Sequence, residues 1–318
     1  MLQGWVVVII ALAYIGFLFL VASYGDRRRE LARGTTSRLF IYPLSLAIYC
    51  TSWTFFGSVG LASRNGFDFL TIYIGPMLMV GLGYPLIIRL VRHAKAQNIT
   101  SIADLIAARY GKSQAVAATV AMIAIVGMIP YIALQLKAVS SSVSTILNEA
   151  AAHGAALPML GDIALFVALL MAAFAVLFGT RHIDATEHQD GLMLAIATES
   201  IVKLVAFLAV GIFVTFVMFP GPVALFTRAL AQPDTAAVLT RLPPLAGFGA
   251  MTTLSFFAIV LLPRQFHVMV VENHSEAEVR RAAWMFPIYL VLINLFVMPI
   301  AMAGLLTFPA GGTDAAGL

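Results

Sequence analysis

Long apolar segments constrain the fold of this chain more than any other feature of its sequence. A helix needs about 20 consecutive apolar residues to cross the hydrocarbon core of a bilayer. Eight such segments can be distinguished, at approximately 5–23, 39–63, 69–91, 116–147, 163–179, 192–219, 248–271 and 282–308. Charged residues make up only 11% of the chain, whereas a soluble domain carries about 25%. The sequence therefore predicts an all-α polytopic membrane protein.

The distribution of lysine and arginine predicts the orientation of these spans. With the N-terminus outside, thirteen basic residues fall in or beside the inner loops, and only Arg64, Arg228 and Arg241 fall outside. Cytoplasmic loops carry the excess of basic residues in membrane proteins, so we expect the N-terminus to lie outside the cell. The same bias explains the net charge of +4 without any affinity for nucleic acid.

The middle of the second span is unusually polar for a helix at membrane depth. Residues 49–60 read YCTSWTFFGSVG. Small and hydroxyl residues suit a helix that is unwound beside a water-lined cavity, where hydroxyl oxygens can satisfy freed backbone groups or a ligand. Alternatively, Gly57 and Gly60 allow a neighbouring helix to approach closely, with the hydroxyls bonding across the contact. The pattern alone leaves both interpretations open.

Apart from Arg89, which is counted with the basic residues beside an inner loop, four charged side chains lie inside the predicted spans. Charge in a membrane span is costly and is usually paired or functional. The four are Lys137, Glu199, Lys203 and Arg264. Glu199 and Lys203 are spaced i, i+4 and can neutralise each other on one helix face. Lys137, close to Gln135, can extend towards the outer interface. Arg264 marks either the inner boundary of the seventh span or a second broken helix.

The sequence lacks the motifs typical of enzymes and metal sites. It contains no nucleotide-binding glycine loop, no nucleophile elbow and no paired catalytic carboxylates. The single cysteine, Cys50, provides neither a disulfide nor a thiolate metal site. His182 and His188 lie in an acidic inner loop without a metal-ligand spacing, so we expect this loop to hydrogen-bond the ends of neighbouring helices. We predict that the chain is not an enzyme and that it binds no metal.

Five stretches of the sequence resemble a known family. They are AIYCTSWTFFGSVG (47–60), ADLIAARYG (103–111), YIALQLK (131–137), GTRHIDATEHQDG (179–191) and LPRQFH (262–267). Together they resemble the membrane domain of the sodium/solute symporter family, most closely the version fused to the N-terminus of bacterial sensor histidine kinases. The resemblance covers most of the chain and implies a multi-pass protein of the bacterial inner membrane.

The resemblance also implies an inverted-repeat transporter fold, with the ligand site at the first helix of each repeat. Residues 1–318 then form one symporter-like domain: a leading helix at 5–23, a first repeat at about 39–219 and a partial second repeat at about 248–308. The second span and the seventh, with residues 251–267, become the two broken helices. Because three helices of the second repeat are lacking, we expect these residues to be a fragment that cannot transport alone.

The function implied by this resemblance is recognition or transport of a small polar solute, such as an amino acid. Occupancy of the site would be transmitted to a cytoplasmic kinase module of the same polypeptide, the only part expected to be an enzyme. The alternatives are a fragment of a stand-alone secondary transporter and a membrane anchor or dimerisation scaffold. The candidate solute-binding residues are Tyr49, Thr51, Ser52, Trp53, Gly57, Gln135 and Ser255.

The coupling ion could be sodium or a proton, and the sequence argues against sodium. Aligned on Trp53, Tyr49 lies where proline symporters of the family carry an acidic residue linked to sodium, and hard cations prefer carboxylate and carbonyl oxygens. Other sodium-binding hydroxyls of the family belong to a ninth span. We predict that solute affinity, measured by calorimetry, changes little when choline replaces sodium at constant ionic strength. A large loss of affinity in choline would contradict this prediction.

Overall fold

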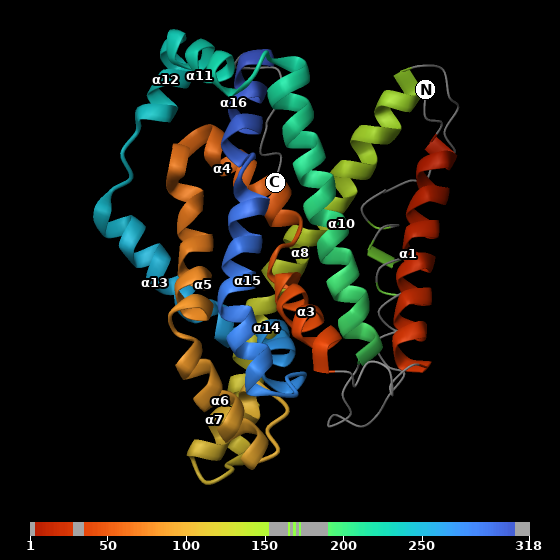
Figure 1. The fold of residues 1–318 in the computed structure, drawn as a ribbon, viewed down its shortest axis with the longest axis vertical. Helices are drawn as coiled ribbons and strands as arrows, with labels where there is room; N and C mark the ends of the chain where they lie inside the picture. Colours follow the sequence, from red (N-terminus) through yellow and green to blue (C-terminus); the bar gives the residue numbers. More distant parts are fainter. Residues whose placement is uncertain are drawn as a thin grey trace.

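The computed structural model describes residues 4–27, 35–152 and 190–308, with four further positions between 165 and 172. Every element within these ranges is helical (Figure 1). The first half contains α1 (Gly4–Arg27), α3 (Thr35–Ser45), η1 (Leu46–Tyr49), η2 (Trp53–Gly57), α4 (Ser58–Asn65), η3 (Gly66–Leu70), α5 (Thr71–Gly81), α6 (Tyr84–Ala96), α7 (Ile102–Arg109) and α8 (Gln114–Ala152). The second half contains α10 (Asp190–Ile212), η4 (Phe213–Met218), α11 (Pro222–Ala231), α12 (Pro233–Thr240), α13 (Leu245–Leu261), α14 (Pro263–Phe266), η5 (His267–Val271), α15 (Glu276–Asn294) and α16 (Val297–Thr307).

The described residues provide fewer candidate membrane spans than the eight predicted. Three helical segments are long and apolar enough to cross a membrane: Gln114–Thr145, Asp190–Met218 and Glu276–Thr307. Two bent pairs raise the number to five: Arg38–Tyr49 with Trp53–Gly81, and Pro233–Thr240 with Leu245–Leu261. The second predicted span and the first part of the third therefore lie within one bent pair, and the apolar part of the first, Ile9–Gly25, is short. Most of the fifth predicted span lies outside the described residues.

The helices form an elongated bundle whose two ends differ. In Figure 1, α3, α5, α10 and α15 run between an end formed by α6 and α7 and an opposite end covered by α11 and α12. Helix α15 packs against α3 and α5, α13 lies along α5, and α10 lies between α3 and α1. Large aromatic side chains fill the centre, where Tyr42, Tyr73, Phe266 and Phe286 are fully buried.

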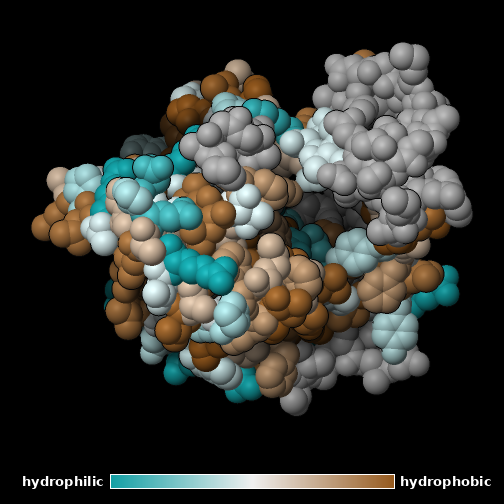
Figure 2. Space-filling model, turned by 90° about the horizontal axis from the view of Figure 1, so that it is seen from above, coloured by the Kyte–Doolittle hydropathy of each residue, from teal (hydrophilic) through white to brown (hydrophobic). Residues whose placement is uncertain are grey.

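The outer surface of the bundle is strongly apolar. On α8, Met122, Ile123, Val126 and Ile129 are each 61–68% exposed. Hydrophobic side chains also reach the rim of the molecule when it is seen from above (Figure 2). Exposed apolar surface on this scale is typical of a face that contacts lipid or another protein. The described part of the chain is therefore all-helical and has the character of a membrane protein.

The second predicted span is interrupted in its middle. Helix α3 continues as the 3-10 turn η1, Cys50 then adopts an extended conformation (φ −80°, ψ 105°), and the chain resumes as the π-helix η2. The axis bends by 62° across this break. Of the two interpretations left open above, the structure shows the unwound backbone. The atoms nearest to a Cβ atom added at Gly57 belong to the side chain of Trp53, in its own segment.

The seventh predicted span is interrupted as well. Helix α13 ends at Leu261, Leu262 is extended (φ −64°, ψ 123°), and α14 begins at Pro263. A residue before proline is disfavoured in the helical region because its own backbone clashes with the proline ring. The break at Leu262 thus follows directly from the local sequence and places Arg264 and Gln265 on a new, short helix.

Packing of α13 against α5 provides a test of this architecture. A Cβ atom at Gly75 would overlap Ser255 and the backbone of Phe256, and would lie 2.6 Å from the carbonyl oxygen of Thr252. We predict that Gly75→Ala lowers the free energy of unfolding by about 1–3 kcal/mol, as overpacking does in protein interiors. Gly127→Ala on α8 is the control, because nothing lies within 4 Å of its new Cβ atom. Equal thermal stability of the two variants in detergent would contradict the packing described.

Candidate functional site

The carbonyl groups freed at the break of the second span receive donors from distant helices. The amide Nε2 of Gln265 donates to the carbonyl oxygen of Leu46 at 3.0 Å. The Nζ of Lys203 donates to the carbonyl oxygen of Cys50 at 3.1 Å. Buried backbone groups must find such partners because an unpaired one costs free energy. These two bonds tie the break in the second span to α14 and to α10.

The four predicted intramembrane charges are distributed over three places. Glu199 and Lys203 form the expected i, i+4 ion pair, at 2.8 Å, beside the break at Cys50. Arg264 donates from Nη2 to the hydroxyl of Tyr131 at 2.8 Å and lies 5.3 Å from the centre of its ring. Lys137 is exposed on α8. The contacts of Arg264 thus connect the second broken segment to α8.

A cavity of about 220 Å³ lies between the η2–α4 segment and α8. It is lined by Ser52, Trp53, Gly57, Gly60, Leu61, Arg64, Leu134, Gln135 and Ala138. Four of the predicted solute-binding residues are in this set, and they come from two segments about 80 positions apart. The hydroxyl of Ser52 donates to Oε1 of Gln135 across the cavity wall. We refer to this space as the first cavity.

Gly57 determines how the indole of Trp53 lies at the first cavity. A Cβ atom at Gly57 would be 2.7 Å from both Nε1 and Cε2 of Trp53. Real Cβ atoms do not approach other atoms so closely, so the indole lies against the backbone only because position 57 is glycine. A larger residue here would displace the ring.

The other three predicted binding residues do not line the first cavity. Tyr49 donates its hydroxyl to the carbonyl oxygen of Ile72 at 2.7 Å. Thr51 lies in the break itself, where its carbonyl oxygen accepts from the backbone amide of Thr54. Ser255 is buried in the α5–α13 contact and donates to the carbonyl oxygen of Thr71 at 2.6 Å. All three have a structural role in the packing around the break or along α5.

Arg64 lines the first cavity but was treated in the sequence only as an outer basic residue. Gly57, Gly60, Leu61 and Arg64 follow the spacing i, i+3, i+4, i+7, which places them on one helix face. This spacing is the signal that could have identified Arg64 as part of the site.

A second cavity of about 260 Å³ adjoins the first and shares Leu61 with it. It is lined also by Asn65, Asp68, Thr71, Ile72, Arg241, Pro244, Gly247, Phe248 and Met251. Arg241 and Asp68 face each other within it, with Nη2 and Oδ2 3.8 Å apart. Its residues belong to α4, η3, the start of α5 and the segment around the start of α13. The sequence did not predict this cavity.

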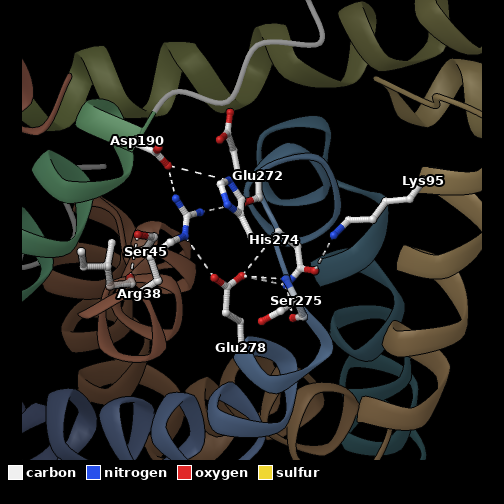
Figure 3. Close-up of polar contacts among 10 residues, drawn as sticks. Arg38, Ser45, Lys95, Asp190, Glu272, His274, Ser275 and Glu278 are labelled. Carbon is white, nitrogen blue, oxygen red and sulfur yellow. Dashed lines mark hydrogen bonds and ion pairs between the residues drawn. The ribbon is translucent and has the colours of Figure 1, made fainter. Parts of the chain in front are cut away.

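A buried ionic cluster joins four segments near the α6–α7 end of the bundle (Figure 3). The Arg38 side chain is only 8% exposed. It forms ion pairs with Asp190 and with Glu278, the latter from Nε to Oε1 at 3.1 Å, and it donates to the carbonyl oxygen of Glu272 at 3.1 Å. A single guanidinium therefore connects α3, α10, the linker after η5 and α15.

Glu278 has a second role at the start of α15. Its Oε2 accepts from the backbone amide of His274 at 2.8 Å and from Nδ2 of Asn273 at 3.2 Å, and it forms a capping box with Ser275. Lys95 on α6 donates to Oδ1 of Asn273 at 3.3 Å. Burial lowers the pKa of the Lys95 ammonium, and the nearby charge of Glu278 partly opposes that shift. The sequence did not predict this cluster.

Comparisons with known proteins give no identification. No family model, no curated protein and no solved structure matches the chain. Within the ranges that the structure describes, no three His, Cys, Asp or Glu side chains are grouped as metal ligands would be. The inner loop with His182 and His188 lies outside those ranges.

The ionic cluster predicts a large difference between two arginine substitutions. Arg38→Gln leaves the carboxylates of Asp190 and Glu278 buried without their cation, so we expect it to lower the free energy of unfolding by about 3–5 kcal/mol. Arg92→Gln removes an exposed bidentate pair with Glu276, and such pairs contribute little. A denaturation titration in mixed micelles measures both variants. A similar small effect of the two would show that the Arg38 cluster does not hold the helices together.

Proposed function

We propose that this chain is a membrane domain of sodium/solute symporter type that recognises a small solute in the first cavity. The observation that carries the proposal is the composition of the cavity wall: Ser52, Trp53, Gly57 and Gln135, selected from the sequence as binding residues, line one space. In this proposal the chain binds its solute and does not convert it.

The character of the cavity supports a role in ligand binding. Small-molecule sites combine mostly apolar walls with a few polar groups that fix the orientation of the ligand. Here Leu61, Leu134 and Ala138 provide apolar surface, and Gln135 and Arg64 provide polar groups. The cavity also lies beside an interrupted helix, and non-helical backbone at membrane depth is tolerated where it is buried in protein or lines a cavity.

The two interrupted segments support the transporter-like part of the proposal. In inverted-repeat transporters the substrate site is formed by discontinuous helices. In this chain the hydrogen bond from Gln265 to Leu46 joins the two segments directly. The proposed arrangement is a leading helix, a first repeat at about 39–219 and a partial second repeat at about 248–308. Location in a bacterial inner membrane and signalling to a kinase module remain proposals that rest on the resemblance alone.

Two substitutions test whether the first cavity binds a solute. We expect Gly57→Ala, which pushes the indole of Trp53 away from the backbone, to weaken binding at least tenfold. Gln135→Met removes the amide while keeping a side chain of similar length, and we expect a similar loss. Binding is measured by calorimetry against a panel of amino acids and their deaminated acids, on protein with unchanged helix content.

Gly127→Ala is the matched control for Gly57→Ala, because both place a methyl group on a helix but only one meets another side chain. The control should bind like the unchanged protein. Full affinity in both cavity variants would place the site elsewhere. Absence of binding across the whole panel would favour the anchor or scaffold alternative.

A further inference from the structure

An arginine near the α6–α7 end of the bundle has no carboxylate partner among the described residues. It is Arg281, in the second turn of α15, where α15 packs against α3 (Figure 1). We propose that its guanidinium binds the phosphate of an anionic glycerophospholipid in the inner leaflet of the membrane. The residues of this site line neither of the two cavities, so the site is separate from the one proposed for the solute.

The guanidinium of Arg281 is held by two aromatic rings. Its Cζ atom lies 4.6 Å from the centre of the Phe40 ring on α3 and 4.9 Å from the centre of the Trp284 ring on α15. Arginine stacks on aromatic rings through its flat face, which leaves the donors at its edge for hydrogen bonds. The Nε atom is buried and has no hydrogen-bond acceptor among the described residues. Because the side chain is only partly buried, the two terminal NH₂ groups are the donors that an external anion can reach.

The carboxylates in the first turn of α15 have cations of their own. Both oxygens of Glu276 accept from Arg92 on α6, and Glu278 forms its ion pair with Arg38 on α3. Neither carboxylate is therefore left to neutralise Arg281. A charge in a membrane span is costly unless it is paired, so an anion from the surroundings would stabilise this arginine.

The surface beside Arg281 is apolar and suits an acyl chain. Trp284, Ile288 and Val291 follow the spacing i, i+4, i+7, which places them on one face of α15. They are 49%, 50% and 54% exposed. Tryptophan is enriched at the level of the lipid headgroups, and basic pockets between spanning helices on the cytoplasmic side bind anionic headgroups. The combination of an arginine with a long apolar face favours a lipid over a free phosphate ion.

The charge of the site selects among phospholipids. The planar fork of arginine matches two oxygens of a phosphate group. Phosphatidylglycerol carries this phosphate as its only charge, whereas phosphatidylcholine carries an ammonium group as well. That ammonium would find Glu276 and Glu278 already paired, so we expect the anionic lipid to bind more strongly. The bound lipid would contact both α3 and α15 beside the Arg38 cluster.

Fluorescence of Trp284 tests the inference, because this residue is part of the proposed site. The chain has three tryptophans, and Trp5→Phe with Trp53→Phe leaves Trp284 as the only reporter. The full chain is reconstituted in vesicles that contain phosphatidylglycerol or phosphatidylcholine brominated in the acyl chains, since bromine quenches a tryptophan that it contacts. We expect phosphatidylglycerol to associate at Trp284 about fivefold more strongly, the effect of about one basic charge near an anionic lipid. Equal quenching by the two lipids would overturn the inference.

Substitutions of two adjacent arginines locate the phosphate. Arg281→Gln should bring the two lipids to equal association, and Arg281→Lys should keep part of the preference because the charge remains without the fork. Arg280→Gln is the matched control. Arg280 is 66% exposed and lies 3.9 Å from a carboxylate oxygen of Glu276, so its removal should leave the preference unchanged.

The other outcomes contradict the proposal in different ways. Full preference in Arg281→Gln, or a loss confined to Arg280→Gln, would show that Arg281 does not hold the phosphate. Inorganic phosphate in excess should not displace the lipid, and displacement would show a site for the free ion instead. Circular dichroism checks the helix content of each variant. If Arg281→Gln does not fold, the comparison of the two lipids on the reporter protein still decides.

Discussion

The interruption of the second span at Cys50 is the constraint on which the surrounding structure depends. An extended residue within an apolar segment frees carbonyl groups that lipid cannot satisfy. In this protein Lys203 and Gln265 provide the missing donors, from α10 and α14. The same interruption starts the π-helix that carries Trp53 and Gly57 to the first cavity. The hydrogen bonds from Lys203 and Gln265 to the freed carbonyl groups and the position of the first cavity therefore both follow from the same interruption of the helix.

Features that depend on neighbouring residues were predictable from the sequence. Hydroxyl and glycine residues at membrane depth made an interrupted backbone near Cys50 one of two interpretations, and the i, i+4 spacing of Glu199 and Lys203 indicated their ion pair. Features that depend on residues far apart in the sequence were not predictable. Arg38 was counted only as an inner basic residue, because its partners are 152 and 240 positions away. The number of spans was also overestimated for the described residues, since hydropathy does not show that two apolar segments form one bent pair.

Two arginines show that the role of a residue type depends on its position in the fold. Arg38 is buried and already bonded on several sides, so it fixes helices relative to one another. Arg64 is exposed and lines the first cavity. The distribution of basic residues along the sequence treats both arginines only as indicators of membrane orientation. The three-dimensional contacts are needed to show that Arg38 fixes helices and that Arg64 lines a cavity.

The long sequence separations in the Arg38 cluster have a consequence for biosynthesis. A chain emerges from the ribosome N-terminal end first, so α3 is made long before α15, which provides Glu278 and its capping box. During that interval Arg38 lacks a carboxylate that it contacts in the finished protein. The end of α3 that carries Arg38 can reach its final position only after nearly the whole described chain has been synthesised. Synthesis and final assembly of this helix are thus separate events in time.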